Sequence, residues 1–571
     1  MSEYSFKHKD CLVRMDRSTQ VLSVEVNERE TRLRPRDCNR LAFRSNDDRE
    51  AIPLFSFHSG PFEPSPAPTI AEEVSGKTVP LMAFAYKAKR FNDWLYGTLD
   101  RSAFLSDSPV LGRQALVSQL RVALDDTADR VDLKAMLCAA EYLGGGSDLS
   151  HLPGELRLRV KQALKEFEAK PLVSRPIGFY SASESLRRLF QHDRMLQQPL
   201  DRNAAQVLRD AITQAQLLNA YRWHLQANEQ LTGQFAVPSV MAELSPENQY
   251  ALFPPSRAPE TDLIKQLYGN VPIPDDFCLL DEVIVRVKGG RLDLSPAEDD
   301  GWYLRELYAL EALLNPSCDR LRVGPKYGET LEQLFKGLMS LARETHIKQL
   351  ESPYAGGAML NLAIMPHLRL EPVPRYYERM AHNYGWLLDG LVELWGESAL
   401  TREVRNRNDQ PTCILDSLTE MQALFSGAAA LCREDLGFPT PPMDAVGCMS
   451  RGQARKFLSN WKHEPDLLAD CRMMVPLYHD VMRKKTRVSV VCGVLSQKIS
   501  VQFEQKPQVQ ITDATGRSVN TDITWLSSAY TSVYPVQFEC DVSDVLDRET
   551  FQNLADQHPV PSELKAVLKA L

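Results

Sequence analysis

The chain lacks any long hydrophobic run. Its longest apolar stretch, AMLNLAIM at 358–365, is much shorter than the ~20 residues that a helix needs to cross a bilayer. The first residues, MSEYSFKHKD, are polar and charged, without the apolar core of a signal peptide. The sequence therefore predicts no membrane span, and we expect the protein in the cytoplasm.

Closely spaced cysteines are also missing. The 571 residues include 11 cysteines, and no two of them form a Cys-x-x-Cys pair. This spacing argues against a thioredoxin-type redox centre and against a zinc ribbon. An odd number of cysteines scattered along a large chain favours reduced thiols in a cytosolic protein.

Neither sign of charge dominates. Lys and Arg total 66 against 75 Asp and Glu, which gives a formal net charge of -9. A weakly acidic chain gives no global electrostatic attraction for nucleic acid, which is therefore an unlikely partner. Hydrophobic residues make up 43%, enough for a large core, so a wholly disordered chain is excluded.

The strongest catalytic motifs are absent. There is no phosphate-binding GxxxxGK[ST] loop, no GxGxxG after a strand and no HExxH. The segment GCMSRG at 447–452 has the spacing GxxSxG, which differs from the GxSxG of a nucleophile elbow. The sequence thus assigns no reaction by motif.

Hydrophobic periodicity predicts a mainly α protein with small β elements. We expect a β-rich segment at 1–60, a Pro-rich connector at 61–79 and a helical body at 80–484. Within that body, Val283, Val285 and Val287 alternate before Gly289 and Gly290, which predicts a β-hairpin at 283–294. The last part of the body, 465–484, is predicted to be a helix. Alternating β-branched residues then predict a small antiparallel β domain at 485–545, followed by short helices at 546–571.

Potential catalytic groups are densest at 343–389. His346, His367 and His382 fall within 37 residues. Glu378 and His382 are one turn apart on an expected helix, where they can bind one metal ion or act as a carboxylate-oriented base. His346 falls on an apolar stripe, and the alternation in HLRLEP places His367 and Glu371 on one face.

These residues form the candidate site. Glu378, His382 and His346 are the candidate catalytic residues, and His367, Glu371, Glu378 and His382 are the candidate metal ligands. This set of imidazoles and carboxylates permits zinc, iron or manganese. The alternative interpretation is that Glu378 and His382 belong to the solvated face of an amphipathic helix, and that His346 is a buried, hydrogen-bonded core residue.

Two functions are compatible with these patterns. The first is an enzyme, hydrolytic or oxidative, with a metal or acid/base site in the helical body. The second is a non-catalytic interaction protein, in which the helical body is a platform and the β domain at 485–545 binds a protein partner. Local crowding of ionisable groups favours the first, and the absence of strong motifs favours the second.

Overall fold

We analysed a computed structural model of the whole chain. Its description covers residues 3–570 with the following gaps: 9–10, 17–21, 27–28, 34–37, 48–49, 58–64, 75–76, 106–108, 125–129, 147, 246–247, 258, 269–272, 275–276, 298–299, 315–320, 323–324, 347–367, 437, 439–444, 481–482, 504–507, 513–517 and 523–526. The chain divides into two compact units, Met1–Ser65 and Pro66–Leu571.

The first unit consists of β-strands. An antiparallel sheet has the order β1-β2-β3-β4, and β5 pairs with β6 in a separate antiparallel hairpin. The bounds are β1 Glu3–His8, β2 Cys11–Asp16, β3 Leu22–Val26, β4 Arg29–Leu33, β5 Cys38–Asp47 and β6 Glu50–Phe57. The expectation of β structure near the N-terminus is therefore confirmed.

The second unit is mainly helical. Its longer helices are α2 Leu81–Phe104, α3 Arg113–Ala123, α4 Val131–Leu143, α5 Gly154–Glu168, α7 Glu184–Leu196, α8 Arg202–Gln214, α9 Leu218–Thr232, α10 Pro259–Leu267, α11 Leu279–Lys288, α12 Trp302–Glu311, α13 Pro325–His346, α14 Pro374–Trp395, α16 Ile414–Asp435, α17 Ala445–Asn460, α18 Arg548–Gln557 and α19 Pro561–Ala570. Short helices are α1 Ile70–Glu73, α6 Pro171–Ser174 and α15 Glu397–Leu400. The mainly α fold class is confirmed.

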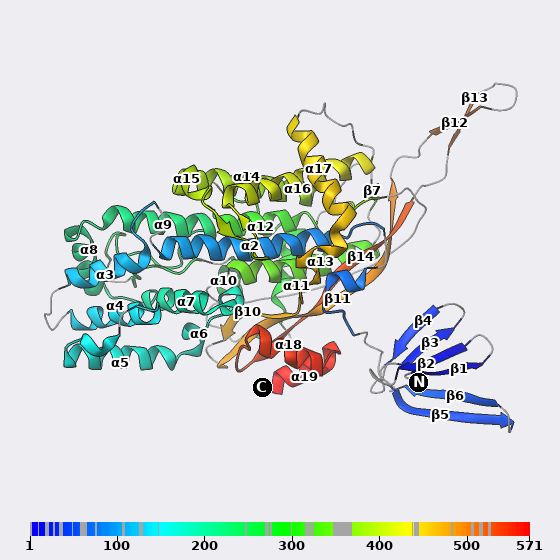
Figure 1. Ribbon diagram of the computed structural model, residues 1–571, viewed down its shortest axis with the longest axis horizontal. Helices are drawn as coiled ribbons and strands as arrows, with labels where there is room; N and C mark the ends of the chain where they lie inside the picture. Colours follow the sequence, from blue (N-terminus) through cyan, green and yellow to red (C-terminus); the bar gives the residue numbers. More distant parts are fainter. Residues whose placement is uncertain are drawn as a thin grey trace. The chain divides into compact units, whose positions relative to one another are not determined.

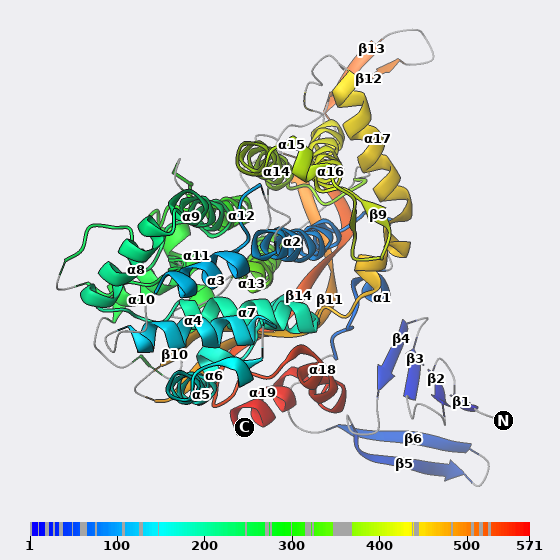
Figure 2. The same cartoon turned by 60° about the vertical axis from the view of Figure 1, so that its left-hand side comes forward.

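Helix α2 lies in the middle of this unit (Figures 1 and 2). Helices α7, α12, α13 and α14 surround it, and α16 and α17 follow outside α14. Most of its side chains are buried, including Lys89, Asn92 and Asp100. Helix α2 thus places several charged and amide groups in the interior. Because buried polar groups need hydrogen-bond or ionic partners, we expect other parts of the protein to pair with them.

The C-terminal sheet lies between helices. Strands β10 Met473–Asp480, β11 Lys485–Phe503 and β14 Ser527–Val542 have the antiparallel order β10-β11-β14, so β14 is at one edge. Short strand β7 Leu321–Arg322 joins β11, whereas β12 Gln508–Thr512 pairs with β13 Ser518–Asp522 and β8 Val404–Arg405 with β9 Pro411–Thr412. The small antiparallel β domain near the C-terminus is confirmed.

The two faces of this sheet differ. One face presents Val488, Val490 and Cys540 to the apolar side chains of α18 and α19. The other packs on α13, where a Cβ at Gly337 would overlap Pro535 of β14. This close approach explains a glycine inside a long helix, because a larger residue would push α13 off the sheet.

The predicted hairpin at 283–294 is wrong. Residues Leu279–Lys288 form helix α11. Two of the three alternating valines also fall on a helical stripe, because Leu280, Val283, Ile284 and Val287 recur at three- and four-residue spacing and are all buried. Gly289 and Gly290 end the helix instead of making a hairpin turn.

The predicted helix at 465–484 is also wrong. Strand β10 occupies Met473–Asp480 and pairs with β11, with a register shift between Pro476 and Tyr478. Both faces of this strand are buried, so its apolar run shows no alternation that would distinguish a strand from a helix. The sheet thus begins before the boundary expected at 485.

No helix in the described part of the chain is both long enough and apolar enough to cross a membrane.

Candidate functional site

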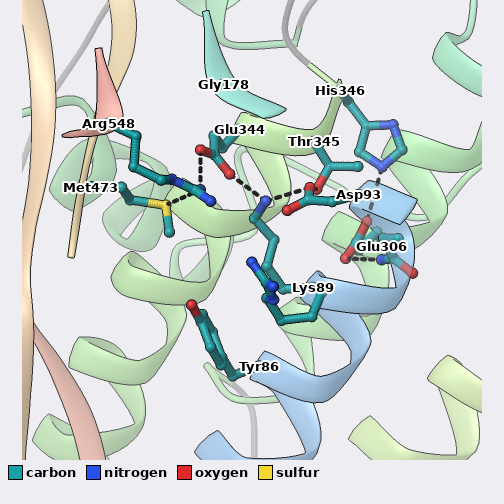
Figure 3. Close-up of polar contacts among 12 residues, drawn as sticks. Tyr86, Lys89, Asp93, Gly178, Glu306, Glu344, Thr345, His346, Met473 and Arg548 are labelled. Atoms are coloured by element: carbon teal, nitrogen blue, oxygen red, sulfur yellow. Dashed lines mark hydrogen bonds and ion pairs between the residues drawn. The ribbon is translucent and has the colours of Figure 1, made fainter. Parts of the chain in front are cut away.

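His346 lies in a closed polar cluster at the end of α13 (Figure 3). Its Nε2 is 3.0 Å from Oε2 of Glu306, and Oε1 of Glu306 accepts a hydrogen bond from Asn92 at 2.9 Å. The rings of Trp302 and Tyr303 pack against the imidazole, whose side chain is 1% exposed. The imidazole is buried, its Nδ1 has no hydrogen-bond partner among the described residues, and a catalytic role for His346 stays a prediction.

A second buried group of charges lies beside it. Lys89 of α2 contacts Glu344 and Asp93, and Glu344 also binds Arg548 of α18 at 2.6 Å (Figure 3). Burial by itself would raise the pKa of Glu344, but the charges of Arg548 and Lys89 outweigh it and lower this pKa. Because each carboxylate has a cationic partner, this cluster joins α2, α13 and α18 as a structural element.

Glu371 has a separate structural role. It is fully buried, and its carboxylate accepts hydrogen bonds from the Leu81 backbone N–H and the Ser532 hydroxyl, both at 2.8 Å. It therefore joins the start of α2 to β14. Burial raises the pKa of Glu371 to about 7, because these hydrogen bonds only partly offset the cost of desolvating the charge.

Glu378 and His382 lie on the surface of α14. The Glu378 carboxylate is 2.5 Å from Arg433, and His382 is exposed. Both residues line one shallow hollow. His346 and Glu371 are not among the residues that line this hollow. His367 lies outside the described residues.

The described residues contain no group of three or more His, Cys, Asp or Glu side chains placed to hold one metal ion. Of the candidate metal ligands in the described residues, Glu378 and His382 line the same hollow. Binding of zinc, iron or manganese by these two residues stays a prediction.

A cleft with a volume of about 1010 Å³ lies along the edge of β14. Five consecutive residues of this strand, Gln537–Asp541, line it together with residues of α11, α13 and α19. Successive side chains of a strand point to opposite faces. A cleft that contacts all five therefore follows the edge of the strand instead of one face of the sheet.

Cations predominate in this cleft. Six basic side chains line it against three carboxylates: Lys336, Arg483, Lys485, Arg487, Lys565 and Lys569 against Asp281, Glu539 and Asp541. Arg487 is engaged by Asp541 at 2.7 Å. Within the described parts of the chain, Lys485, Lys565 and Lys569 have no carboxylate at ion-pair distance. Their charges are available to a ligand.

The base of the cleft is formed where β14 meets α11. The buried Glu539 carboxylate accepts hydrogen bonds from the backbone N–H groups of Leu279 and Leu280, each at 3.0 Å, and from the Cys278 thiol at 3.1 Å. Burial raises the pKa of the Cys278 thiol, and nearby Glu539 raises it further. Cys278 is therefore held as a thiol, which is a poor nucleophile.

Sequence reasoning missed this cleft. The predicted β domain at 485–545 already included Lys485 and Arg487, which are alternate residues of β11, but nothing in the sequence indicated that they would line a cleft. The spacing of Lys565 and Lys569, one helical turn apart, was a usable signal for a basic helix face. Their approach to β14 depends on tertiary packing and had no local signal.

No known protein-family model matches the chain, and neither a curated protein nor a solved structure matches it.

Proposed function

We propose that the protein binds an extended, acidic segment of a partner protein by adding it as a strand to the edge of β14. The observation that carries this proposal is the cleft along Gln537–Asp541, which contacts residues from both faces of the strand. This function corresponds to the interaction protein that the sequence allows, with the C-terminal β domain as the binding module.

The geometry supports an extended ligand. An edge strand presents backbone N–H and C=O groups in a row, and peptides bind many domains by pairing with such a row. Here α13 packs on one face of the sheet and α19 on the other. A strand added between them would be covered on both sides, which excludes water from its hydrogen bonds.

The charges support an acidic ligand. Lys565 and Lys569 of α19 and Lys485 of β11 line the cleft without a carboxylate partner among the described residues. Lys is a flexible point charge that suits an irregular series of carboxylates, whereas bidentate phosphate recognition favours Arg. Arg487 is already engaged by Asp541. These features favour an acidic peptide over nucleic acid.

We further propose that the protein acts in the cytoplasm. Eight cysteines whose side chains are described are free thiols, and six of these eight are buried. Free thiols of this kind are typical of a reducing compartment.

The test is fluorescence anisotropy with the full-length protein and a labelled peptide of alternating Glu and Val. We expect saturable binding of this peptide and none of its Lys–Val analogue. An otherwise identical Glu–Val peptide with N-methyl groups at every backbone nitrogen has no N–H donors on either edge, and we expect it to lose binding at least about tenfold.

Charge reversal supplies the matched comparison. The double variant Lys565→Glu/Lys569→Glu should weaken binding by about tenfold or more, because two attractive charges become repulsive. Lys161→Glu/Lys165→Glu makes the same change one turn apart on the exposed face of α5 and should leave affinity unchanged. Equal loss in both variants, retained binding of the N-methylated peptide, no binding of the Glu–Val peptide, or tighter binding of a single-stranded oligonucleotide would each overturn the proposal.

A further inference from the structure

A second hollow opens between α12 and α14 and has a volume of about 390 Å³. This volume is within the range of pockets that hold small molecules. It is lined by Arg305 and Tyr308 of α12, by Glu378, Arg379, His382 and Asn383 of α14, and by Ser295 and Pro296 of the preceding loop. It differs in lining and size from the cleft at β14.

Arg305 provides a cation without an ion-pair partner among the described residues, although Asp300 is near enough to interact with its charge. Its guanidinium lies 3.9 Å from the centre of the Trp386 ring, and Nη2 donates to the Ala297 carbonyl at 3.1 Å. Among the described residues no carboxylate is within ion-pair distance, and its buried Nε has no acceptor. Stacking on Trp386 holds the planar guanidinium in one orientation, which suits bidentate binding of a carboxylate.

Asn383 adds an amide without partners. The residue is 1% exposed, and neither Nδ2 nor Oδ1 makes a hydrogen bond to the part of the chain that is described. Buried side-chain amides are nearly always hydrogen-bonded, so such a group indicates a missing partner. The Asn383 amide and the Arg305 Nε thus belong to the same hollow and both lack partners.

The other charges of the hollow are compensated within the protein. Glu378 is paired with Arg433 at 2.5 Å, and Arg379 with Glu311 at 2.7 Å. Among the described residues, the charged group of the hollow that has no ion-pair partner is the Arg305 guanidinium, and the exposed His382 imidazole also lines the hollow. A ligand that complements the hollow therefore carries a negative charge.

We infer that this hollow binds a small organic carboxylate. The ligand carboxylate would bind the free edge of the Arg305 guanidinium, and its remaining polar group would satisfy the Asn383 amide. The inference rests on residues that the peptide-binding proposal does not use, so either can fail without the other.

Isothermal titration calorimetry of the full-length protein with glutarate, citrate and benzoate tests the inference. We expect saturable binding of at least one of these three anions, and none of glutaramide, the uncharged isostere of glutarate. Arg305→Gln should weaken this binding at least tenfold, and Asn383→Leu should also weaken it. If circular dichroism shows that Arg305→Gln does not fold, Arg305→Lys keeps the charge, loses the planar fork and should still bind less tightly.

Arg455→Gln is the matched control, because Arg455 is an exposed arginine of α17 outside the lining of the hollow. It should bind as the wild type does. The inference is overturned if none of the three carboxylates binds, if glutaramide binds as tightly as glutarate, or if the folded Arg305 variant keeps wild-type affinity.

Discussion

The carboxylate of Glu539 accepts the backbone N–H of Leu280 at 3.0 Å, across a separation of 259 residues. A side chain of β14 thus supplies the cap for the N-terminus of α11, where Cys278 and the helix itself leave backbone donors unpaired. The same contact fixes the base of the cleft to which we assign peptide binding.

Removing this cap should destabilise the protein. Glu539→Ala leaves two buried N–H groups without an acceptor, and we expect the free energy of unfolding to fall by about 1–3 kcal/mol. Glu539→Gln retains an acceptor oxygen and should cost less. Urea denaturation followed by circular dichroism measures both, and equal losses in the two variants would contradict this role.

The stability of the protein should depend on pH through Glu371. The pKa of its carboxyl is about 7 in the folded chain, whereas an unperturbed glutamate carboxyl titrates near 4.5. Between these values the folded state keeps a proton that the unfolded state releases, so rising pH favours unfolding. We expect this group alone to lower the free energy of unfolding by about 3 kcal/mol between pH 4.5 and pH 7.

The variant Glu371→Gln isolates this effect, because glutamine imitates the protonated acid at every pH. Denaturation at pH 5 and pH 8 should show similar stability of the two proteins at pH 5 and a more stable variant at pH 8. A constant difference between wild type and variant across this range would show that Glu371 does not titrate there.

The buried ion cluster around Lys89 should be sensitive to the loss of one charge. Lys89→Met leaves Glu344 and Asp93 buried with one cation fewer, and we expect a loss of about 3–5 kcal/mol. Arg188→Met removes an exposed ion pair with Glu184 on α7 and should cost about 0.5 kcal/mol or less. Comparable losses in the two variants, measured by thermal unfolding, would contradict the importance of the cluster.

The hypothesis of a metal at Glu378 and His382 makes its own prediction. Arg433 pairs with Glu378 and would compete with a metal for its carboxylate. Arg433→Ala should therefore raise the affinity for zinc. Because an exposed ion pair contributes about 1 kcal/mol or less, the increase should be at most about fivefold. His382→Ala should abolish zinc binding. Calorimetric titration with zinc measures both, and the same heat in all three proteins would contradict the hypothesis.

Sequence patterns were most informative where a helix has one buried face. The stripe of Leu156, Val160, Leu164 and Phe167 predicts the helix that is observed as α5. The patterns failed at α11 and β10, where short apolar runs fit two periodicities and long-range pairing decides between them. Secondary-structure propensity depends on neighbours within about ten residues. It therefore cannot predict that Glu539 caps α11 or that β11 pairs with β10.

The candidate site was harder to predict than the fold. Sequence spacing places Glu378 and His382 together on α14, and both do line one hollow. Sequence spacing does not predict that Arg433 pairs with Glu378. It also does not predict that Arg305 and the unpaired Asn383 amide line the same hollow, although these two groups determine what the hollow can bind. Proximity between distant segments arises only from tertiary packing.

The central position of α2 has a consequence for synthesis of the chain. The Leu81 N–H and the Tyr86 hydroxyl find their acceptors 290 and 384 residues later, at Glu371 and Asp470. At about 5–20 residues per second, translation reaches Asp470 roughly 20–80 s after Tyr86. During that interval α2 can pack on the helices already made, but its contacts with Asp470 and with the later strand β14 are still missing, so its native surroundings are completed only near the end of synthesis.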